Sequence, residues 1–324
     1  MTQESKIFDI KSNTDFNELA LKIFHYQSKN VSIYQKYLSH LKIDPLSIKD
    51  IHSIPFLPIR FFKSHKVINL NMEYERIFKS SGTTDSIKSK HYIVSLALYK
   101  KSFINSFKEK YGNINDYTIL ALLPSYLEQG DSSLIFMVNE LLKISSKNSQ
   151  HITNSSSEFE QLAIKFKNEK TILIGVSYAL LDLCQEKTYD LSNWIVMETG
   201  GMKGRRKELT REELHQILKK AFNLKSIHSE YGMTELLSQA YSIKDSYFNP
   251  PPWMKILIRE INDPFQYCLD DKTGGINVID LANINSCSFL ATDDLGKINK
   301  HGFKVLGRFD QSDTRGCNQL NTLF

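Results

Sequence analysis

Three polar segments of the sequence combine side-chain oxygens with glycine or arginine, the combination that binds phosphates, sugars and metal ions. In the first, four hydroxyl side chains surround one glycine: Ser80, Ser81, Gly82, Thr83 and Thr84. The glycine lets backbone N–H groups converge on an anion, and the hydroxyls add further donors. The pattern differs from the GxxxxGK[ST] phosphate loop. It predicts a phosphate-binding loop, with a polar turn as the alternative.

The second segment follows a predicted short strand at residues 225–229. It consists of Tyr231, Gly232, Met233, Thr234 and Glu235. A tyrosine ring stacks on a purine, and a glycine lets the backbone approach a nucleotide closely. Hydroxyl and carboxylate oxygens are ligands that Mg²⁺ accepts. The alternative is a plain strand-to-helix turn capped by the threonine.

The third segment lies near the C-terminus and pairs carboxylates with an arginine. Asp293 and Asp294 follow a predicted strand, and Arg308 follows the next one. A carboxylate at a strand end accepts hydrogen bonds from both ribose hydroxyls, and a guanidinium binds a phosphate through parallel hydrogen bonds. A β-turn with a surface ion pair is the alternative.

Strands and helices alternate through the middle of the chain, after an N-terminal helical pair at residues 14–42 and a proline-containing extended segment at 54–59. Such alternation predicts an α/β fold with a largely parallel sheet. The hydrophobic patterns predict strands at 117–123, 171–176, 193–197 and 225–229, and helices at 132–144, 158–167 and 210–222.

The character of the chain changes at Pro250, Pro251 and Pro252, after which short β-like runs follow one another. Turns are expected at Gly274-Gly275, at Asp293-Asp294 and at Gly302. We therefore expect an α/β core with the N-terminal helical segment at 1–250, a β-rich subdomain at 251–310, and a short tail at 311–324.

Composition and charge argue against several classes of protein. The net charge is +5, from 41 Lys and Arg against 36 Asp and Glu, and the basic clusters are short. They are typical of solvated surface rather than of a nucleic-acid site. No apolar run resembles a signal peptide or a membrane span, so we expect a cytoplasmic protein without integral membrane association. The four cysteines form no CxxC pair and predict neither a disulfide framework nor a zinc site.

In this order, the polar segments resemble the motifs of the superfamily of acyl- and aryl-CoA ligases, adenylation domains and firefly-type luciferases. The resemblance implies the large N-terminal-type domain of adenylate-forming enzymes, with layered sheets, flanking helices and a β-rich subdomain. It also implies synthesis of an acyl-AMP from a carboxylic acid and ATP, with Mg²⁺. Residues 81–84 are similar to the Ser-Gly-Thr-Thr phosphate loop, 231–235 to Tyr-Gly-x-Thr-Glu, 292–295 to Thr-Gly-Asp-Leu and 307–310 to the Gly-Arg-x-Asp hinge motif.

The resemblance further implies which residues act. Thr83 and Glu235 correspond to Mg²⁺ ligands and, with Arg308, to catalytic residues. Related ligases carry another catalytic lysine on a mobile C-terminal domain, whereas this sequence stops at residue 324, 14 residues beyond position 310. We therefore expect that domain to be absent. Lys79, Lys203 and Arg308 are the candidates for the missing positive charge.

The remaining correspondences concern nucleotide binding. Gly200 and Gly201 are candidates for lining the adenine, where a side chain would block a flat ring; a plain turn is the alternative. Asp294 corresponds to the ribose-binding aspartate of the family because Leu295 follows it. Asp293 remains the competitor.

A closer resemblance is to the LuxE-like acyl-protein synthetases of bacterial fatty-acid reductase complexes. Such enzymes adenylate a fatty acid, move the acyl group to one of their own cysteines, and pass it to an acyl-protein reductase partner. The resemblance implies that Cys317 is this cysteine, and neighbouring Arg315 would favour its thiolate. Without the resemblance, a lone cysteine is more often a small buried apolar residue. The similar segments are Pro-Phe-Leu-Pro at 55–58, Phe-Phe-Lys-Ser at 61–64, Leu-Pro-Ser-Tyr-Leu-Glu at 123–128, Thr-Gly-Gly-Met-Lys at 199–203 and Arg-Gly-Cys at 315–317.

Two other functions are compatible with the same residues. One is a ligase that delivers the acyl group to CoA or to a carrier-protein thiol, with Cys317 playing no part. The other is a catalytically silent subunit that binds nucleotide or acyl chains and acts as a scaffold.

Overall fold

The computed structural model describes residues 3–81, 87–124, 130–201 and 209–309, and Cys317 lies outside this part. The expected N-terminal helical pair is present. Its first helix, α2, begins at a capping box in which Ser12 and Asp15 satisfy each other's backbone N–H groups. The helices are α1 (Gln3–Lys6), α2 (Asn13–Asn30), α3 (Ser32–His40), α4 (Phe61–Ser64), α5 (Leu96–Tyr111), α6 (Ser133–Ile144), α7 (Ser156–Lys165), α8 (Ser177–Glu186) and α9 (Arg211–Phe222).

Six strands form a mostly parallel sheet in the order β5-β4-β6-β7-β8-β9, in which only β9 runs antiparallel to its neighbour. Every residue of the central strands β4 and β6 is buried, as expected for a parallel sheet covered on both faces. The predicted strands and helices of this region are present, but the strand expected at 225–229 is β8, which begins three residues later and includes Glu230 and Tyr231. The strands are β4 (Thr118–Leu122), β5 (Gln150–His151), β6 (Thr171–Val176), β7 (Ile195–Thr199), β8 (His228–Tyr231) and β9 (Ala240–Ser242).

The C-terminal part forms a second sheet, as predicted from its β-rich pattern. Its order is β1-β12-β11-β10, with β13 also paired to β12. One strand, β1, comes from the extended segment near residue 57, so the sheet also uses the N-terminal part of the chain. The domain boundary near residue 250 stays a prediction. The strands are β1 (Leu57–Pro58), β10 (Met254–Arg259), β11 (Gly274–Asp280), β12 (Phe289–Asn299) and β13 (Gly302–Arg308).

Two of the predicted turns in this sheet are wrong. Strand β12 continues through Asp293 and Asp294, because pairing with β11 and β13 on either side outweighs the low strand propensity of aspartate. Gly274 and Gly275 open β11 instead of forming a turn. A β-carbon at either position would collide with Arg259 on the neighbouring strand, so these glycines permit close strand approach.

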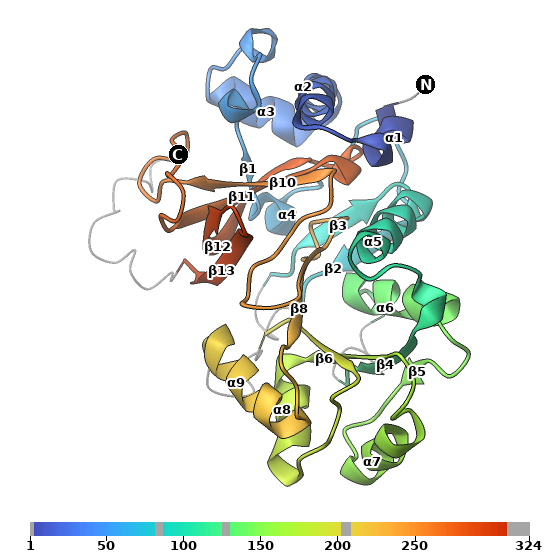
Figure 1. Cartoon of the computed structure of the whole chain (residues 1–324). Coiled ribbons are helices and arrows are strands. Elements are labelled where there is room, and N and C mark those ends of the chain that lie inside the picture. Colours follow the sequence, from blue (N-terminus) through green and yellow to red (C-terminus); the bar gives the residue numbers. More distant parts are fainter. Residues whose placement is uncertain (1–2, 82–86, 125–129, 202–208, 310–324) are drawn as a thin grey trace.

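The two sheets are stacked with helices around them (Figure 1). The second sheet lies in the upper half against α2 and α3. The six-stranded sheet lies below it, with α5 and α6 on one side and α7, α8 and α9 on the other. The predicted fold class, an α/β protein of layered sheets with flanking helices and a β-rich part, is confirmed. No helix in the described ranges is long and apolar enough to cross a membrane.

A separate hairpin lies between the sheets and carries the first polar segment. It consists of β2 (Arg76–Lys79) and β3 (Lys90–Ile93), which pair antiparallel. The ring of Phe78 anchors it by packing against Tyr99 and Phe136, with ring centroids 5.6 and 5.4 Å away. The strand that leads to Ser80 is therefore anchored in the core.

A buried carboxylate, Asp280 at the end of β11, ties the two sheets together. It accepts hydrogen bonds from the backbone N–H groups of Leu237 (2.8 Å), Ser238 (3.0 Å) and Ala282 (3.1 Å). The Ser238 hydroxyl donates a further bond of 2.6 Å. Because Leu237 and Ser238 follow the second polar segment, Asp280 fixes that segment against the second sheet.

Replacing Asp280 with alanine leaves these buried backbone donors without acceptors. We expect Asp280→Ala to lower the free energy of unfolding by about 3–5 kcal/mol, measured by urea denaturation. The control is Asp263→Ala, which removes one exposed hydrogen bond to the backbone of Phe265 and should cost no more than about 1 kcal/mol. Equal losses in the two variants would contradict this role of Asp280.

Candidate nucleotide and acid site

The second and third polar segments meet at a buried hydrogen bond. The Tyr231 hydroxyl, at the end of β8, donates to Asp294 Oδ2 at 3.0 Å. Arg308 on β13 approaches the other oxygen of the same carboxylate at 3.3 Å. Burial raises the pKa of Asp294, and Arg308 and Tyr231 oppose that rise. The Arg308 side chain is 80% exposed, so its guanidinium remains accessible to a ligand.

The two neighbouring aspartates point in opposite directions, because successive strand residues face opposite sides of a sheet. Asp293 forms an ion pair with Arg60, with both carboxylate oxygens 3.1 Å from Nε. Asp294 faces Tyr231 and Arg308 instead. The structure therefore brings Asp294, rather than Asp293, together with the other candidate residues. Both aspartates lie within β12 and not at a strand end.

The carboxylate of Glu235 lies close to this group. It is 7% exposed, and burial raises its pKa, while a hydrogen bond from Ser89 and the charge of Arg308 oppose the rise. The negative charge of Asp294 adds to the increase. The backbone carbonyl of Glu235 accepts a 2.8 Å bond from Asn283, which fixes its main chain. One buried carboxylate beside solvent-accessible neighbours fits Mg²⁺, which usually binds one or two carboxylates plus substrate phosphates.

The β2–β3 hairpin is attached to the same segment. His91 Nδ1 donates to the backbone carbonyl of Thr234 at 2.8 Å, since a carbonyl only accepts. Burial lowers the pKa of His91 to about 4, so this histidine is neutral. Ser80 pairs with Ser89 through its backbone N–H (3.1 Å) and its hydroxyl oxygen (3.0 Å). The start of the predicted phosphate loop therefore lies beside Thr234 and Glu235.

The remaining predicted nucleotide residues are only partly described. Ser81, Gly200 and Gly201 are exposed, and Gly232, Met233 and Thr234 are half-buried. Gly200 has φ of +65°, a left-handed conformation that glycine adopts without strain, and nothing lies within 4 Å of a β-carbon placed on Gly201. An open glycine surface of this kind fits a flat ring. Gly82, Thr83, Thr84, Lys203 and Cys317 lie outside the described residues.

The candidate cations differ in availability. Lys79 forms an ion pair with Asp131 at 2.7 Å, so its charge is already partly neutralised. Arg308 keeps an exposed guanidinium beside the buried carboxylates. No cluster of three or more His, Cys, Asp or Glu side chains suited to a metal occurs in the described ranges.

Sequence reasoning gave no role to Glu230, which the structure places half-buried beside the site. Thr199 on the neighbouring strand donates a 2.5 Å hydrogen bond to Glu230 Oε2. Burial raises the pKa of Glu230 to about 7, with a contribution from the charge of Glu198. The signal available in the sequence was a carboxylate between the strand predicted at 225–229 and Tyr231.

The described cysteines are poor candidates for nucleophiles. Cys184, Cys268 and Cys287 are all free thiols. Burial raises the pKa of Cys287 to about 12 and also raises the pKa of Cys268. A raised pKa reduces the thiolate fraction, and the thiolate is the reactive form.

The Tyr231 hydroxyl is expected to stabilise the fold as well as the position of Asp294. Removing it in Tyr231→Phe leaves a buried carboxylate oxygen without its donor and should lower the free energy of unfolding by about 1–3 kcal/mol. Urea denaturation measures this change. The exposed Tyr74, changed to phenylalanine, is the matched control and should alter stability by no more than about 0.5 kcal/mol.

Glu230 makes stability depend on pH. Its pKa is raised on folding from 4.5 to about 7, so its ionisation destabilises the folded state between these values. We compare the free energy of unfolding of Glu230→Gln with that of the original protein. The difference, variant minus original, should increase by about 2–4 kcal/mol from pH 4.5 to pH 8. Urea denaturation at the two pH values measures it. A difference in the free energy of unfolding that stays constant with pH would contradict the raised pKa of Glu230.

Comparisons with known proteins agree with this architecture. The structure resembles 2-hydroxyisobutyryl-CoA ligase in its postadenylation state with 2-HIB-AMP, with a TM-score of 0.68 and 11% identity over 94% of this chain and 70% of that one. It also resembles ATP-bound MatB from Rhodopseudomonas palustris, with a TM-score of 0.55 and 16% identity over 72% of this chain. The chain covers 47% of MatB, about half its length. These likenesses show the fold alone.

No match to a curated protein sequence was found. The family described as acyl-protein synthetase, LuxE, matches residues 4–323, nearly the whole chain. The resemblance derived from the sequence motifs is thereby confirmed. This chain belongs to the LuxE acyl-protein synthetase family.

Proposed function

We propose that this protein is an acyl-protein synthetase that activates a carboxylic acid with ATP. It forms an acyl-AMP and pyrophosphate, transfers the acyl group to Cys317, and passes it to an acyl-protein reductase partner. Family membership supports acid activation through an acyl-AMP. A fatty acid is our proposal for the substrate, because the sequence motifs resemble those of the synthetases of fatty-acid reductase complexes. ATP-bound MatB shares the fold and supports the use of ATP.

The observation that carries this proposal is the convergence of three distant segments. The hairpin start at Ser80, the carboxylate of Glu235 and the Asp294–Arg308 pair come from different parts of the fold. The charge of Asp294 raises the pKa of Glu235, and Arg308 lowers the pKa of both carboxylates. A nucleotide contacts ribose, phosphate and metal ligands at once, which is the combination gathered here.

The first step joins the acid to the α-phosphate of ATP. A carboxylate oxygen of the acid attacks the α-phosphorus, the bond to the β-phosphate oxygen breaks, and pyrophosphate leaves. Asp294 would accept hydrogen bonds from the ribose hydroxyls, and Arg308 and the Ser80–Thr84 loop would stabilise charge on the phosphoryl oxygens. Mg²⁺ held by Glu235 and Thr83 would neutralise further phosphate charge. Gly200 and Gly201 would line the adenine. The Tyr231 ring is buried against Phe248 and Phe303, so Tyr231 would orient Asp294 through its hydroxyl rather than stack on the purine as expected from the sequence.

The second step moves the acyl group to sulfur. The Cys317 thiolate attacks the acyl carbonyl, the bond to the phosphate oxygen breaks, and AMP leaves. The acyl thioester then passes to the partner. Among the described cysteines, Cys287 and Cys268 have raised pKa values that disfavour this reaction.

One observation favours a second candidate function. The similar ligase has also been solved with 2-HIB-AMP and CoA, at a TM-score of 0.68 and 11% identity. A CoA or carrier-protein ligase would therefore use the same fold, with the acyl group delivered to an external thiol.

The test combines two measurements on Cys317→Ser. Acid-dependent ATP–pyrophosphate exchange reports adenylation, and labelled acid reports the thioester on the protein. We expect exchange to stay within about two-fold of the original protein while labelling is lost, because the thiolate acts only after the acyl-AMP has formed.

The matched control is Cys268→Ser, which changes a half-buried thiol and should retain both activities. Undiminished labelling of Cys317→Ser would exclude Cys317 as the acceptor. Thiol-dependent release of product without any labelled protein would favour the CoA or carrier ligase. ATP binding without exchange would favour a silent scaffold.

A further inference from the structure

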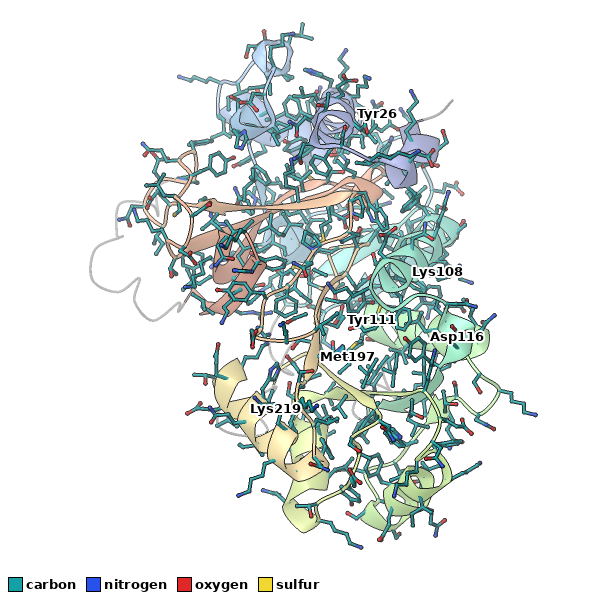
Figure 2. The ribbon with its side chains drawn as sticks, viewed as in Figure 1. Tyr26, Lys108, Tyr111, Asp116, Met197 and Lys219 are labelled. Carbon is teal, nitrogen blue, oxygen red and sulfur yellow. The ribbon has the colours of Figure 1, made fainter. Side chains whose placement is uncertain are left out.

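One arginine side chain, Arg211 at the start of α9, contacts both sheets beside the candidate site. Its Nε donates to Glu198 Oε1 on β7 at 2.9 Å, and its Nη1 donates to the backbone carbonyl of Val305 on β13 at 3.2 Å. Helix α9 and strand β7 lie in the lower half of the molecule, where Lys219 and Met197 mark them in Figure 2. Strand β13 belongs to the second sheet. Arg211 therefore bridges the two sheets directly.

The contact with Glu198 fixes the chain that leads to the candidate adenine surface. Glu198 is 2% exposed and lies two residues before Gly200. Its second carboxylate oxygen is 3.3 Å from the Ser177 hydroxyl, and the same hydroxyl is 3.2 Å from the carbonyl oxygen of Gly200. Hydrogen bonds between charged groups are stronger than those between neutral ones. Arg211 thus holds one end of a bonded chain that ends at Gly200.

The face of the guanidinium leads to the candidate ribose contact. Its central carbon lies 4.9 Å from the ring centroid of Phe248, which is a cation–π distance. The Phe248 ring packs against Tyr231 and Phe303, at centroid distances of 5.8 and 5.4 Å. The Tyr231 hydroxyl donates to Asp294. Arg211 therefore covers the aromatic group that orients Asp294.

The contact with Val305 lies at an irregularity in β13, directly before Arg308. Adjacent residues of β12 pair with Val305 and Gly307, so Leu306 has no place in the register. An extra residue of this kind bends a strand and redirects the side chains next to it. By binding the carbonyl of Val305, Arg211 holds β13 at the point that sets the direction of Arg308.

We propose that Arg211 is a positioning residue that holds the adenine, ribose and phosphate contacts of the nucleotide in fixed relative positions. The residues that it orders are Gly200, Asp294 and Arg308. This role rests on the proposed adenylation and adds to it a side chain outside the reacting groups. An arginine suits the role because a planar guanidinium donates along its edge while its face covers a ring. A lysine ammonium acts only as a point charge.

The test measures acid-dependent ATP–pyrophosphate exchange with ATP and with 2′-deoxy-ATP, using the best substrate of a panel of fatty acids. The missing hydroxyl reports on Asp294. We expect the original protein to prefer ATP in kcat/KM by about 10- to 100-fold, as for a hydrogen bond to a charged group. Arg211→Lys keeps a cation beside Glu198 but cannot make all three contacts. It should reduce this preference by about five-fold or more and raise the KM for ATP, while the KM for the acid stays within about two-fold.

A purely structural role predicts a different result. Loss of folded protein lowers the rate with both nucleotides together and leaves their ratio and the KM for ATP unchanged. Arg211→Ala is unsuitable, because removing one partner of a buried ion pair is strongly destabilising. Phe248→Leu is the second variant: it removes the ring under the guanidinium, keeps the pair with Glu198, and should lower the preference for ATP in the same direction.

The matched control is Arg60→Lys. Arg60 pairs with Asp293, on the opposite face of β12 from Asp294, and its replacement should leave the nucleotide ratio and the KM for ATP within about two-fold. An unchanged ratio and KM for ATP in both Arg211→Lys and Phe248→Leu would overturn the role of Arg211 and leave adenylation standing.

Absence of exchange by the original protein with every acid would count against the proposed function itself. The dissociation constant of ATP, measured by isothermal titration calorimetry, then tests Arg211 alone. An increase of about five-fold or more in Arg211→Lys, with no change in Arg60→Lys, would support the positioning role. Equal dissociation constants in Arg211→Lys and the original protein would overturn it.

Discussion

The candidate site depends on one buried carboxylate, Asp280. Its side chain is fully buried, yet it accepts three backbone hydrogen bonds and one from the Ser238 hydroxyl. A buried charge is tolerated only when its hydrogen-bonding capacity is filled. These bonds hold the turn after Glu235 against the end of β11. The relative position of the two sheets, and hence of the carboxylates on them, follows from this contact.

The two sheets contribute differently to the site. The parallel sheet presents the ends of its strands, where the chain leaves regular hydrogen bonding and backbone groups become available to a ligand. The antiparallel sheet presents the middle of a strand, where alternation directs Asp294 toward Tyr231 and Asp293 toward Arg60. A site built from both sheets therefore combines loop residues at strand ends with one carboxylate whose direction is fixed by its strand.

Two glutamates on adjacent strands have opposite pKa shifts because their partners differ. Glu198 is buried, but Arg211 and His215 hold its pKa below the ordinary value. Glu230 is half-buried and accepts a hydrogen bond from Thr199, and loss of hydration raises its pKa to about 7. Glu198 stabilises the sheet as an ion pair, whereas Glu230 has no ion-pair partner among the described residues.

The sequence by itself determined the fold class, most of the strands and helices, and three motifs in order, because periodicity and turn chemistry are local properties. It failed at Asp293-Asp294 and Gly274-Gly275, where cross-strand pairing overrode local propensity. It also left Glu230 without a role. Only the tertiary structure decided which aspartate faces Tyr231 and which of the two glutamates, Glu198 or Glu230, is ion-paired. The direction of a side chain and its loss of hydration depend on residues far apart in the chain.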